Sequence, residues 1–533
     1  MASSKTKCIH SLLFFLYLTS VSFPTFNSLV YLWPLPKQLT FGNGTVAVDP
    51  SLSFQVQGVA HTSAILEDAF QRCKKAVFND RSVIARSAAA DYALSVVKVV
   101  VESADETLQL GVDESYSLFV SKDDGRSIIG EATIEANTIY GALRGLETFS
   151  QLCIFNYETK SVEINSIPWY IQDEPRFPFR GLMLDTSRHY LPVNVIKQII
   201  ESMSYVKLNV LHWHIIDEEA FPLEVPSYPD LWKGSYTKWE RYTIEDAQEI
   251  VRFAKMRGIS VMAEVDVPGH SRSWGVGYPE LWPSLSCTEP LDVAKNFTFD
   301  VISGILSDMR KIFPFELFHL GGDEVHPECW NTTMHVSEWL HENNMTTRDA
   351  YQYFVSRAQQ IAINLNWTPV NWEETFIAFK EKLSPQTIIH NWLVAGICPQ
   401  AVAAGFRCIY SNQGLWYLDH LDVPWEEVYS ADPMEGIHDK AQQKLLIGGE
   451  VCMWGETADT SDVQQTIWPR AAAAAERMWS TREATSTANL SSIILPRLEY
   501  FRCLLNRRGI PAAPVRNFFA RRPPTEAGSC YSQ

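Results

Sequence analysis

The stretch FRGLMLDTSRHYLPVNVIKQIIESMSYVKLNVLHWHIID, residues 179–217, decides the fold of this chain. It contains a short apolar strand that ends in polar and charged residues, then a loop, a helical stretch and a second apolar strand. Two apolar strands joined through a helix are typical of parallel strands in a sheet covered by helices. The stretch therefore indicates an α/β fold.

The same unit recurs as far as residue 456. We predict eight strands, namely FRGLMLDT (179–186), LNVLHWHIID (208–217), GISVMAEVD (258–266), LFHLGGDE (317–324), TPVNWEE (368–374), TIIHNWL (387–393), FRCIYSN (406–412) and LLIGGEVCMWGE (445–456). Eight strands alternating with helices favour a (β/α)8 TIM barrel. A doubly wound open sheet would show the same alternation, so both architectures stay open at this point.

Candidate functional residues follow the predicted strands. In barrel enzymes the working groups gather at the C-terminal ends of the strands. The acidic, aromatic and histidine side chains at or just beyond those ends are Asp217, Asp266, His270, Asp323, Glu324, Trp372, Trp392, Tyr417, Asp419, Trp454 and Glu456. We expect these side chains to converge on one face of the barrel.

The chain before the barrel has a different pattern. Segments 92–103 and 114–121 alternate as strands do, while 62–78 and 138–153 have the spacing of amphipathic helices. These elements predict a small α+β domain, and no catalytic constellation is visible in its sequence.

A domain boundary is predicted where three prolines interrupt any regular element, at Pro168, Pro175 and Pro178. The 533 residues, 46% of them hydrophobic, are more than one small core needs. We predict a signal peptide at 1–28, an N-terminal α+β domain at 29–172 and a catalytic barrel with a C-terminal extension at 173–533.

The first 28 residues have the layout of a secretory signal. Lys5 and Lys7 precede an apolar run from Leu12 to Val21, which is short for a membrane span; an uncleaved anchor is the alternative. No later stretch is apolar enough to cross a bilayer, so we expect no membrane anchor in the mature chain. Six N-x-S/T sequons then become candidate glycosylation sites, at Asn43, Asn296, Asn331, Asn344, Asn366 and Asn489.

Charge and cysteine content limit the partners and cofactors. A net charge of -17 offers no basic surface for nucleic acid or anionic lipid. Of ten cysteines, Cys8 would leave with the signal peptide, so at least one of the remaining nine should be a free thiol. None has the spacing of a structural zinc site, and we predict neither a metal nor a cofactor.

Two kinds of chemistry fit the strand ends. His212 and His214 lie on one side of a strand, as a pair of metal ligands in a metal-dependent hydrolase would. The competing interpretation, which we favour, makes them hydrogen-bonded polar residues inside the barrel, because tryptophans replace the further histidines that such a site needs.

Tryptophans interleaved with carboxylates describe a carbohydrate site instead. A pyranose ring has apolar faces that stack on indoles and a rim of hydroxyls that carboxylates bind. Asp323 and Glu324 are neighbours in GGDE, whereas glycosidases usually place two carboxyls on opposite sides of the scissile bond. Two close carboxylates also resist being ionised together, so one of the pair could hold a proton and act as an acid.

The motifs FRGLMLDTSRHY, HWHIID, VDVPGH, HLGGDEV, NWEET, WYLD and GGEVCMWGE occur in this order. Together they resemble the glycoside hydrolase family 20 β-N-acetylhexosaminidases, and the likeness covers nearly the whole mature chain. It is nearest to the plant secretory-pathway, vacuolar-type members, and YLWPLPKQL is similar to the start of the family's small first domain.

The resemblance implies why the two acids are adjacent. In this family the 2-acetamido oxygen of the substrate is the nucleophile and forms an oxazolinium ion, with retention of configuration. Glu324 is then the general acid and base. Asp323 is expected to hold the acetamido N–H and to offset the charge that develops there.

Other roles are implied by the same resemblance. Arg180 and Glu456 would bind the 3- and 4-hydroxyls, and Asp419 with Glu456 the 6-hydroxyl. Trp454 would stack on the ring, and Trp372, Trp392 and Tyr417 would enclose the acetamido group. Asp266 and His270 would support Glu324, with Asp217 in the same network.

Three positions depart from the family pattern or vary within it. Ala220 stands where the family usually has a serine, which puts the positioning of Asp217 in doubt. His326 follows GGDE in a variable loop, where we expect it to be solvated. His420 follows Asp419 and argues against strong selection for anionic substrates.

The family also commonly links the loops after the third and fourth strands, which implies a Cys287–Cys329 disulfide. Cys503–Cys530 is a second candidate and Cys398–Cys408 a local one. The expected partner is a glycan or oligosaccharide, with a homodimer as one assembly and the vacuole, then the extracellular space, as destinations. A catalytically silent glycan-binding protein remains the rival to an enzyme.

Overall fold

The computed structural model describes residues 29–59, 63–78, 93–121, 130–393 and 395–516, and residues 31–533 belong to one compact unit. The predicted signal peptide and Cys530 lie outside the described residues. None of the described helices is long and apolar enough to cross a membrane.

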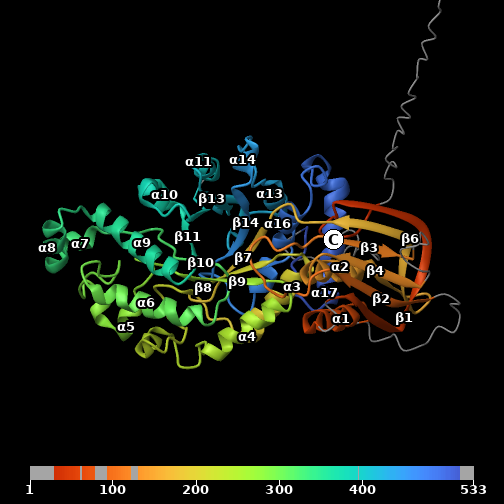
Figure 1. Cartoon of the computed structure of the whole chain (residues 1–533), viewed down its shortest axis with the longest axis horizontal. Coiled ribbons are helices and arrows are strands. Elements are labelled where there is room, and N and C mark those ends of the chain that lie inside the picture. The colour runs from red at the N-terminus through yellow and green to blue at the C-terminus, as the bar shows by residue number, and fades with distance from the viewer. Residues whose placement is uncertain (1–28, 60–62, 79–92, 122–129, 394, 517–533) are drawn as a thin grey trace, which may run out of the picture. The chain divides into compact units, whose positions relative to one another are not determined.

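The N-terminal domain is a six-stranded mixed sheet with two helices beside it (Figure 1). The strand order is β1-β2-β4-β3-β6-β5, and β1 also pairs with β6. Its elements are β1 (Gln38–Gly58), α1 (Ala64–Val77), β2 (Ala93–Val101), β3 (Tyr116–Val120), β4 (Glu131–Ala136), α2 (Ile139–Leu152), β5 (Cys153–Asn156) and β6 (Ser161–Asp173). The predicted α+β class is confirmed, but β1 and β4 to β6 were not predicted.

The second part is a closed barrel of eight parallel strands, which decides between the two architectures left open by the sequence. The strands are β7 (Phe179–Asp185), β8 (Val210–Ile216), β9 (Ser260–Val265), β10 (Leu317–His319), β11 (Thr368–Trp372), β12 (Ile388–Asn391), β13 (Arg407–Tyr410) and β14 (Leu446–Met453). β14 pairs with β7 and closes the barrel. Every residue of β7, β8 and β9 is buried, because helices cover the outside and side chains fill the inside.

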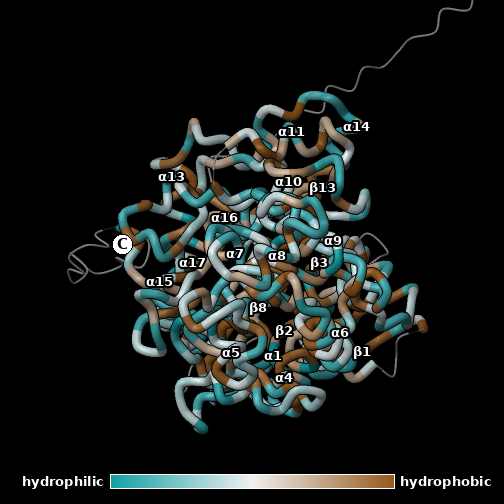
Figure 2. Tube along the Cα trace, turned by 90° about the vertical axis from the view of Figure 1, so that its left-hand side faces the viewer, coloured by the Kyte–Doolittle hydropathy of each residue, from teal (hydrophilic) through white to brown (hydrophobic). Residues whose placement is uncertain are grey.

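Helices surround the barrel in Figure 1. They are α3 (Val193–Tyr205), α4 (Ile244–Lys255), α5 (Trp274–Gly277), α6 (Asn296–Arg310), α7 (Glu328–Thr332), α8 (Met334–Glu342), α9 (Thr347–Asn364), α10 (Glu373–Phe379), α11 (Ile397–Ala403), α12 (Gln413–Trp416), α13 (Trp425–Ser430), α14 (Lys440–Gln443), α15 (Val463–Ile467), α16 (Arg470–Trp479) and α17 (Leu495–Arg507). The starts of α4 and α9 are capping boxes, in which a threonine and an aspartate three residues later satisfy each other's backbone N–H groups. Figure 2 shows hydrophilic residues on outlying loops such as the one at α14.

Buried charges join the two parts. Glu114, just before β3, accepts hydrogen bonds from Arg180 in β7 (2.6 and 2.7 Å) and Arg144 in α2 (2.8 Å). Arg144 also donates to the carbonyl of Gly258, before β9 (2.8 Å). The N-terminal domain therefore packs on the end of the barrel where the strands begin. The predicted boundary at residue 172 stays a prediction, and β6 runs through it.

Two disulfides between described residues lie in the barrel half. Cys287–Cys329 joins the loops that follow β9 and β10, as predicted, and the local Cys398–Cys408 pair is also formed. Cys503 is disulfide-bonded, but its predicted partner lies outside the described residues. Free cysteines among the described residues are Cys73, Cys153 and Cys452, in agreement with the odd number of thiols.

Candidate active site

The GGDE segment forms a loop after β10 rather than the strand end that we predicted. Gly321 and Gly322 have positive φ values of 60° and 95°, which turn the chain out of the barrel. A Cβ atom on Gly321 would lie 1.9 Å from the carboxyl carbon of Asp266, so only glycine fits there. Glu324 itself has a φ of 46°, a strained conformation that is typical of functional sites.

Asp323 and Glu324 face different surroundings although they are adjacent. The Asp323 side chain is buried, whereas the Glu324 side chain is 55% exposed at the barrel mouth. Glu324 lies 3.5 Å from the Nε2 atom of His270, and a hydrogen bond from this imidazole lowers the pKa of Glu324. One carboxyl is therefore open to solvent and the other is enclosed.

His270 is held by Asp217 and not by Asp266, which corrects the predicted support pair. The Nδ1 atom of His270 lies 3.0 Å from Asp217. Asp217 is completely buried, so it lies beneath the pocket, in the network with His270 that the resemblance implied, and not among groups that could bind substrate. Burial alone would lower the pKa of His270, but the surrounding carboxylates hold it well above its usual value.

The like-charged pair that shares a proton is Asp266 with Asp323, not Asp323 with Glu324. Burial and the charge of Asp323 raise the pKa of Asp266 well above its usual range. Burial raises the pKa of Asp323 as well, but the hydrogen bond between the two carboxyls raises the pKa of Asp266 and lowers that of Asp323, which favours a proton on Asp266. Asp266 also accepts a hydrogen bond from the Gly322 N–H (2.8 Å). The hydrogen bond between the two carboxyls fixes Asp323 in the pocket wall.

Four aromatic rings form a continuous wall beside Asp323. Trp392 stacks on Tyr417 with the ring centres 6.1 Å apart, and Tyr417 lies 6.0 Å from Trp454. Trp372 extends the wall at 6.1 Å from Trp454. The three rings predicted to end successive strands do so only in part, because Tyr417 follows α12 and reaches the barrel through a bridge to Cys452 of β14.

The two glutamates after β11 clamp Trp392. Glu373 accepts hydrogen bonds from the Trp392 backbone N–H (2.7 Å) and from Asn391 (2.6 Å). Glu374 accepts one from the Trp392 indole N–H (2.9 Å). Burial and the nearby Asp323 raise the pKa of Glu374 to about 8. Sequence analysis missed both residues, although they occur in the NWEET motif that carried the resemblance.

Arg180 is not in the pocket, which contradicts its predicted role. It lies at the start of β7, is completely buried and binds Glu114 at the opposite end of the barrel. Arg188 occupies the mouth instead. Its guanidinium contacts Asp217 (2.9 Å) and Asp185 (3.1 Å) and lies 5.2 Å from the Trp454 ring centre. The position of Arg188 just after a predicted strand could have identified it, because the functional groups of barrel enzymes lie at the C-terminal ends of the strands and not at their starts.

Two more carboxylates surround the mouth. Glu456 is half-exposed and lies 3.9 Å from Arg188. Asp419 lies in the loop after α12, and burial raises its pKa to about 6. Its Oδ1 atom is buried and has no hydrogen-bond partner. An unpaired buried oxygen at a pocket is available to a hydroxyl of a ligand.

His212 and His214 lie inside the barrel in a hydrogen-bonded cluster, as the favoured interpretation predicts. His212 contacts Glu450 (2.8 Å) and Glu264 (3.0 Å), and His319 contacts Glu264 (2.8 Å). These groups are close enough to hold a cation, and in the cluster each histidine lies within ion-pair distance of Glu264 or Glu450.

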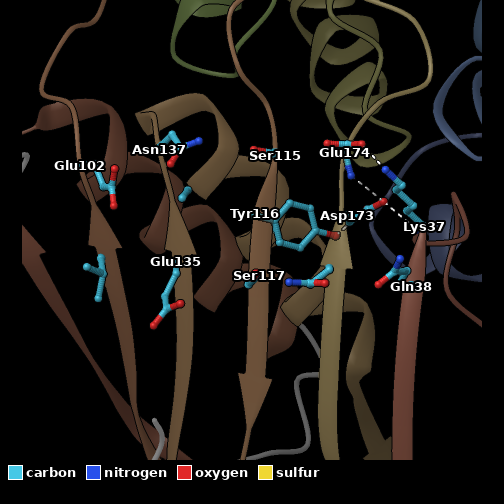
Figure 3. A pocket seen from close by; sticks show the side chains of 13 residues that line it. Lys37, Gln38, Glu102, Ser115, Tyr116, Ser117, Glu135, Asn137, Asp173 and Glu174 are labelled. Atoms are coloured by element: carbon cyan, nitrogen blue, oxygen red, sulfur yellow. Dashed lines mark hydrogen bonds and ion pairs between the residues drawn. The ribbon is translucent and has the colours of Figure 1, made fainter. Parts of the chain in front are cut away.

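A separate cavity of about 590 Å³ lies on the sheet of the N-terminal domain (Figure 3). Glu102, Glu135 and Glu174 line it, and Glu174 is paired with Lys37. The cavity is lined by residues of the N-terminal domain alone, whereas the convergent carboxylates and aromatic rings gather at the C-terminal ends of the barrel strands.

A closed barrel with two carboxyls, an aromatic wall and polar groups around its mouth defines the class of a TIM-barrel glycosidase. The family model for the glycosyl hydrolase family 20 catalytic domain matches residues 177–482, and a model described as beta-acetyl hexosaminidase like matches residues 32–152. The chain belongs to glycosyl hydrolase family 20.

Relatives extend this likeness over most of the chain. It is 69% identical to beta-hexosaminidase 1 of Arabidopsis thaliana over 94% of both chains. It is 34% identical to beta-hexosaminidase subunit alpha of Rattus norvegicus, over 91% of this chain and 94% of that one. Among solved structures, a Flavobacterium johnsoniae chitobiase matches with a TM-score of 0.79 and 28% identity, covering 90% of this chain and 73% of that one.

Proposed function

We propose that the enzyme removes terminal β-linked N-acetylhexosamine residues from glycans or chito-oligosaccharides through an oxazolinium intermediate. The observation that carries the mechanism is the unequal burial of Asp323 and Glu324. One exposed carboxyl can reach a leaving group, and one enclosed carboxyl beside aromatic rings suits a group attached to the sugar. A nucleophile supplied by the substrate removes the need for a second carboxylate across the bond.

Glu324 acts as the acid toward the glycosidic oxygen and then as the base toward water. His270, held by Asp217, orients the Glu324 carboxyl. A bound sugar excludes water from this half-exposed carboxyl, and loss of water raises the pKa of a carboxyl toward that of a useful acid.

Asp323 receives the acetamido N–H and offsets the positive charge of the closing ring. Its proton-bearing neighbour Asp266 keeps Asp323 in place and leaves it as the charged member of the pair. Trp372, Trp392 and Tyr417 exclude water around the acetamido group, with the Tyr417 hydroxyl toward its carbonyl oxygen. Close packing holds that oxygen near the anomeric carbon.

The sugar hydroxyls bind at the mouth. Arg188 takes the place that we had assigned to Arg180 and acts with Glu456 on the 3- and 4-hydroxyls. Asp419 binds the 6-hydroxyl through its unpaired oxygen, and Trp454 stacks on the ring face. The solvated position of His326 and the weak selection for anionic substrates expected from His420 both stay predictions.

Secretion to the vacuole, or else to the extracellular space, is proposed from the N-terminal layout. All six sequon asparagines are exposed, which is compatible with glycosylation. A homodimer stays a prediction from the family resemblance.

The mechanism is tested by comparing Glu324→Gln with Asp323→Asn on aryl and unactivated glycosides of N-acetylglucosamine. Loss of the acid should slow unactivated substrates far more, because an activated phenolate leaves without a proton. Loss of Asp323 should slow both alike, since ring closure precedes departure in every case. Equal losses in Glu324→Gln would contradict this division of roles.

Two further comparisons separate the rival functions. The matching hexoside without an acetamido group should not be hydrolysed, because it lacks the nucleophile. A glycan-binding protein without catalysis would release no product from a chromogenic N-acetylglucosaminide. A metal-dependent hydrolase would lose activity in a chelator, whereas we expect activity to persist.

A further inference from the structure

We infer that Glu264 of β9 is the positioning residue that joins the acid side of the active site to its acetamido side. The inference rests on the proposed function. The Glu264 carboxylate is completely buried and lies inside the barrel beneath the pocket. It is within hydrogen-bond distance of four side-chain nitrogens, those of His214 (2.5 Å), His319 (2.8 Å), His212 (3.0 Å) and Trp372 (3.0 Å).

One of these contacts leads to the catalytic acid. His214 uses its other nitrogen to bind Asp217 at 2.7 Å, and Asp217 binds His270 at 3.0 Å. His270 then reaches Glu324 at 3.5 Å. Each link fixes the ring orientation and tautomer of the next, so a shift of Glu264 would be transmitted to the acid.

Another contact leads to the acetamido pocket. The indole N–H of Trp372 donates to Glu264, which sets the rotation of a ring that is only 1% exposed. Trp372 packs against Trp454, and Trp454 lies beside Tyr417. The same carboxylate therefore orients one wall of the aromatic pocket and, through three residues, the group that donates the proton.

The charges of the cluster favour an ionised Glu264. Burial would raise its pKa, but His319, His214 and His212 hold it well below the usual range. Burial also opposes charge on His214, yet the Glu264 carboxylate is the main factor that raises its pKa, to about 10. The Glu450 carboxylate likewise raises the pKa of His212 to about 9. Both imidazoles, those of His212 and His214, are therefore cations beside the Glu264 anion.

The remaining groups facing the cluster are neutral or lie at its edge. Burial lowers the pKa of His319 to about 4 and that of His390 well below its usual value. Burial raises the pKa of Glu450, although the contact with His212 opposes this shift. Asp266 and Asp323 face the cluster from the pocket side.

An amide at position 264 would disrupt this arrangement. The amide nitrogen of glutamine donates hydrogen bonds, so some of the histidine and indole N–H groups that now donate to Glu264 would face another donor. Loss of the anion would also remove the main charge that holds the His214 proton. Both sides of the active site would lose alignment together, and a displacement on the order of 1 Å costs up to about 100-fold in rate.

The test compares Glu264→Gln with Glu450→Gln, a matched control in the same barrel interior. Glu450 contacts His212 and His390 but, among the described residues, neither His214 nor Trp372, so glutamine there should leave both paths in place and keep kcat within about twofold. For Glu264→Gln we expect kcat to fall roughly 10- to 100-fold, the affinity for a thiazoline analogue of the oxazolinium ion to fall at least about tenfold, and the pH profile of kcat/KM to shift. Analogue binding is measured by calorimetry, which requires no turnover.

Two single-contact variants serve if Glu264→Gln does not fold. Trp372→Phe removes the indole donor together with part of the ring, and it should weaken analogue binding without moving the pH profile. His214→Gln interrupts the path to Glu324 and should move the pH profile of kcat/KM. A folded Glu264→Gln enzyme with unchanged analogue affinity and pH profile would overturn the inference, as would equal losses in Glu450→Gln.

The proposed function is tested by the parent enzyme alone. If the parent does not hydrolyse N-acetylhexosaminides, the proposed function fails whatever the variants do. If the parent is active and the Glu264 variants match the control, only the positioning role is rejected.

Discussion

At the scale of single residues, identity matters less than where a side chain lies along the barrel and how far it is buried. Arg180 and Arg188 lie eight positions apart in one motif, yet one binds Glu114 beneath the barrel and the other binds Asp217 at the mouth. Asp323 and Glu324 are adjacent but differ in exposure, because positive φ values at Gly321, Gly322 and Glu324 turn the loop sharply. In each pair, two residues of similar chemistry therefore have different roles.

The two arginines should therefore fail in different ways. Arg188→Gln should raise KM for an aryl N-acetylglucosaminide by about tenfold or more, because charge-assisted hydrogen bonds to the sugar are lost. Arg180→Gln should leave KM near the parent value and lower the melting temperature, because Glu114 loses a buried partner. Steady-state kinetics with thermal unfolding of both variants checks this, and an Arg180→Gln enzyme with raised KM but parent stability would contradict it.

At the scale of elements, the loop between α12 and α13 brings Tyr417 and Asp419 to the barrel. Arg470 at the start of α16 donates to the carbonyls of His420 (2.8 Å), Val423 (3.2 Å) and Leu418. The N–H of Leu418 donates to Cys452 of β14 (2.8 Å), so the loop is fixed to the last strand. A segment without regular structure thus holds a pocket wall in place.

Asp419 should make substrate binding depend on pH. Burial raises its pKa to about 6, so the carboxyl becomes protonated as the pH falls through 6. An ionised carboxylate is the stronger acceptor for a sugar hydroxyl, so KM should rise as the pH falls through this value. Asp419→Asn should have a higher KM that stays flat across the same range. The test is to measure KM of the parent and of Asp419→Asn between about pH 4.5 and 7.5. If KM depends on pH identically in both enzymes, a group other than Asp419 is responsible for the titration.

At the scale of the molecule, the N-terminal domain contributes to the stability of the barrel. Glu114 joins Arg144 and Arg180, and a second buried group joins Asp173 to Lys207 (2.8 Å) and the Trp479 indole (3.0 Å). Buried charges that lose a partner are strongly destabilising, so these contacts bind the two parts into one unit. The catalytic end of the barrel stays free of the domain.

Removal of the Glu114 charge should destabilise the whole chain. Glu114→Gln leaves two buried guanidinium groups short of their counter-charge and should lower the free energy of unfolding by about 3 to 5 kcal/mol. Glu135→Gln, an exposed position on the same sheet, should change it by less than about 0.5 kcal/mol. The free energy of unfolding of both variants is measured by denaturant titration, and the activity of the folded protein is measured separately. Parent-like stability in Glu114→Gln would show that the joint contributes little.

The sequence by itself determined the repeated strand and helix units, the end of the barrel at which Asp323 and Glu324 lie, and the aromatic character of the pocket. Those features depend on local patterns and on the rule that parallel strands end on one face. Only the tertiary structure decided that Arg188 replaces Arg180, that Asp266 pairs with Asp323, and that Glu264 contacts both sides of the site. Several of these pairings join residues 50 or more positions apart. Register and barrel closure bring side chains of different strands together, and no spacing along the chain specifies them.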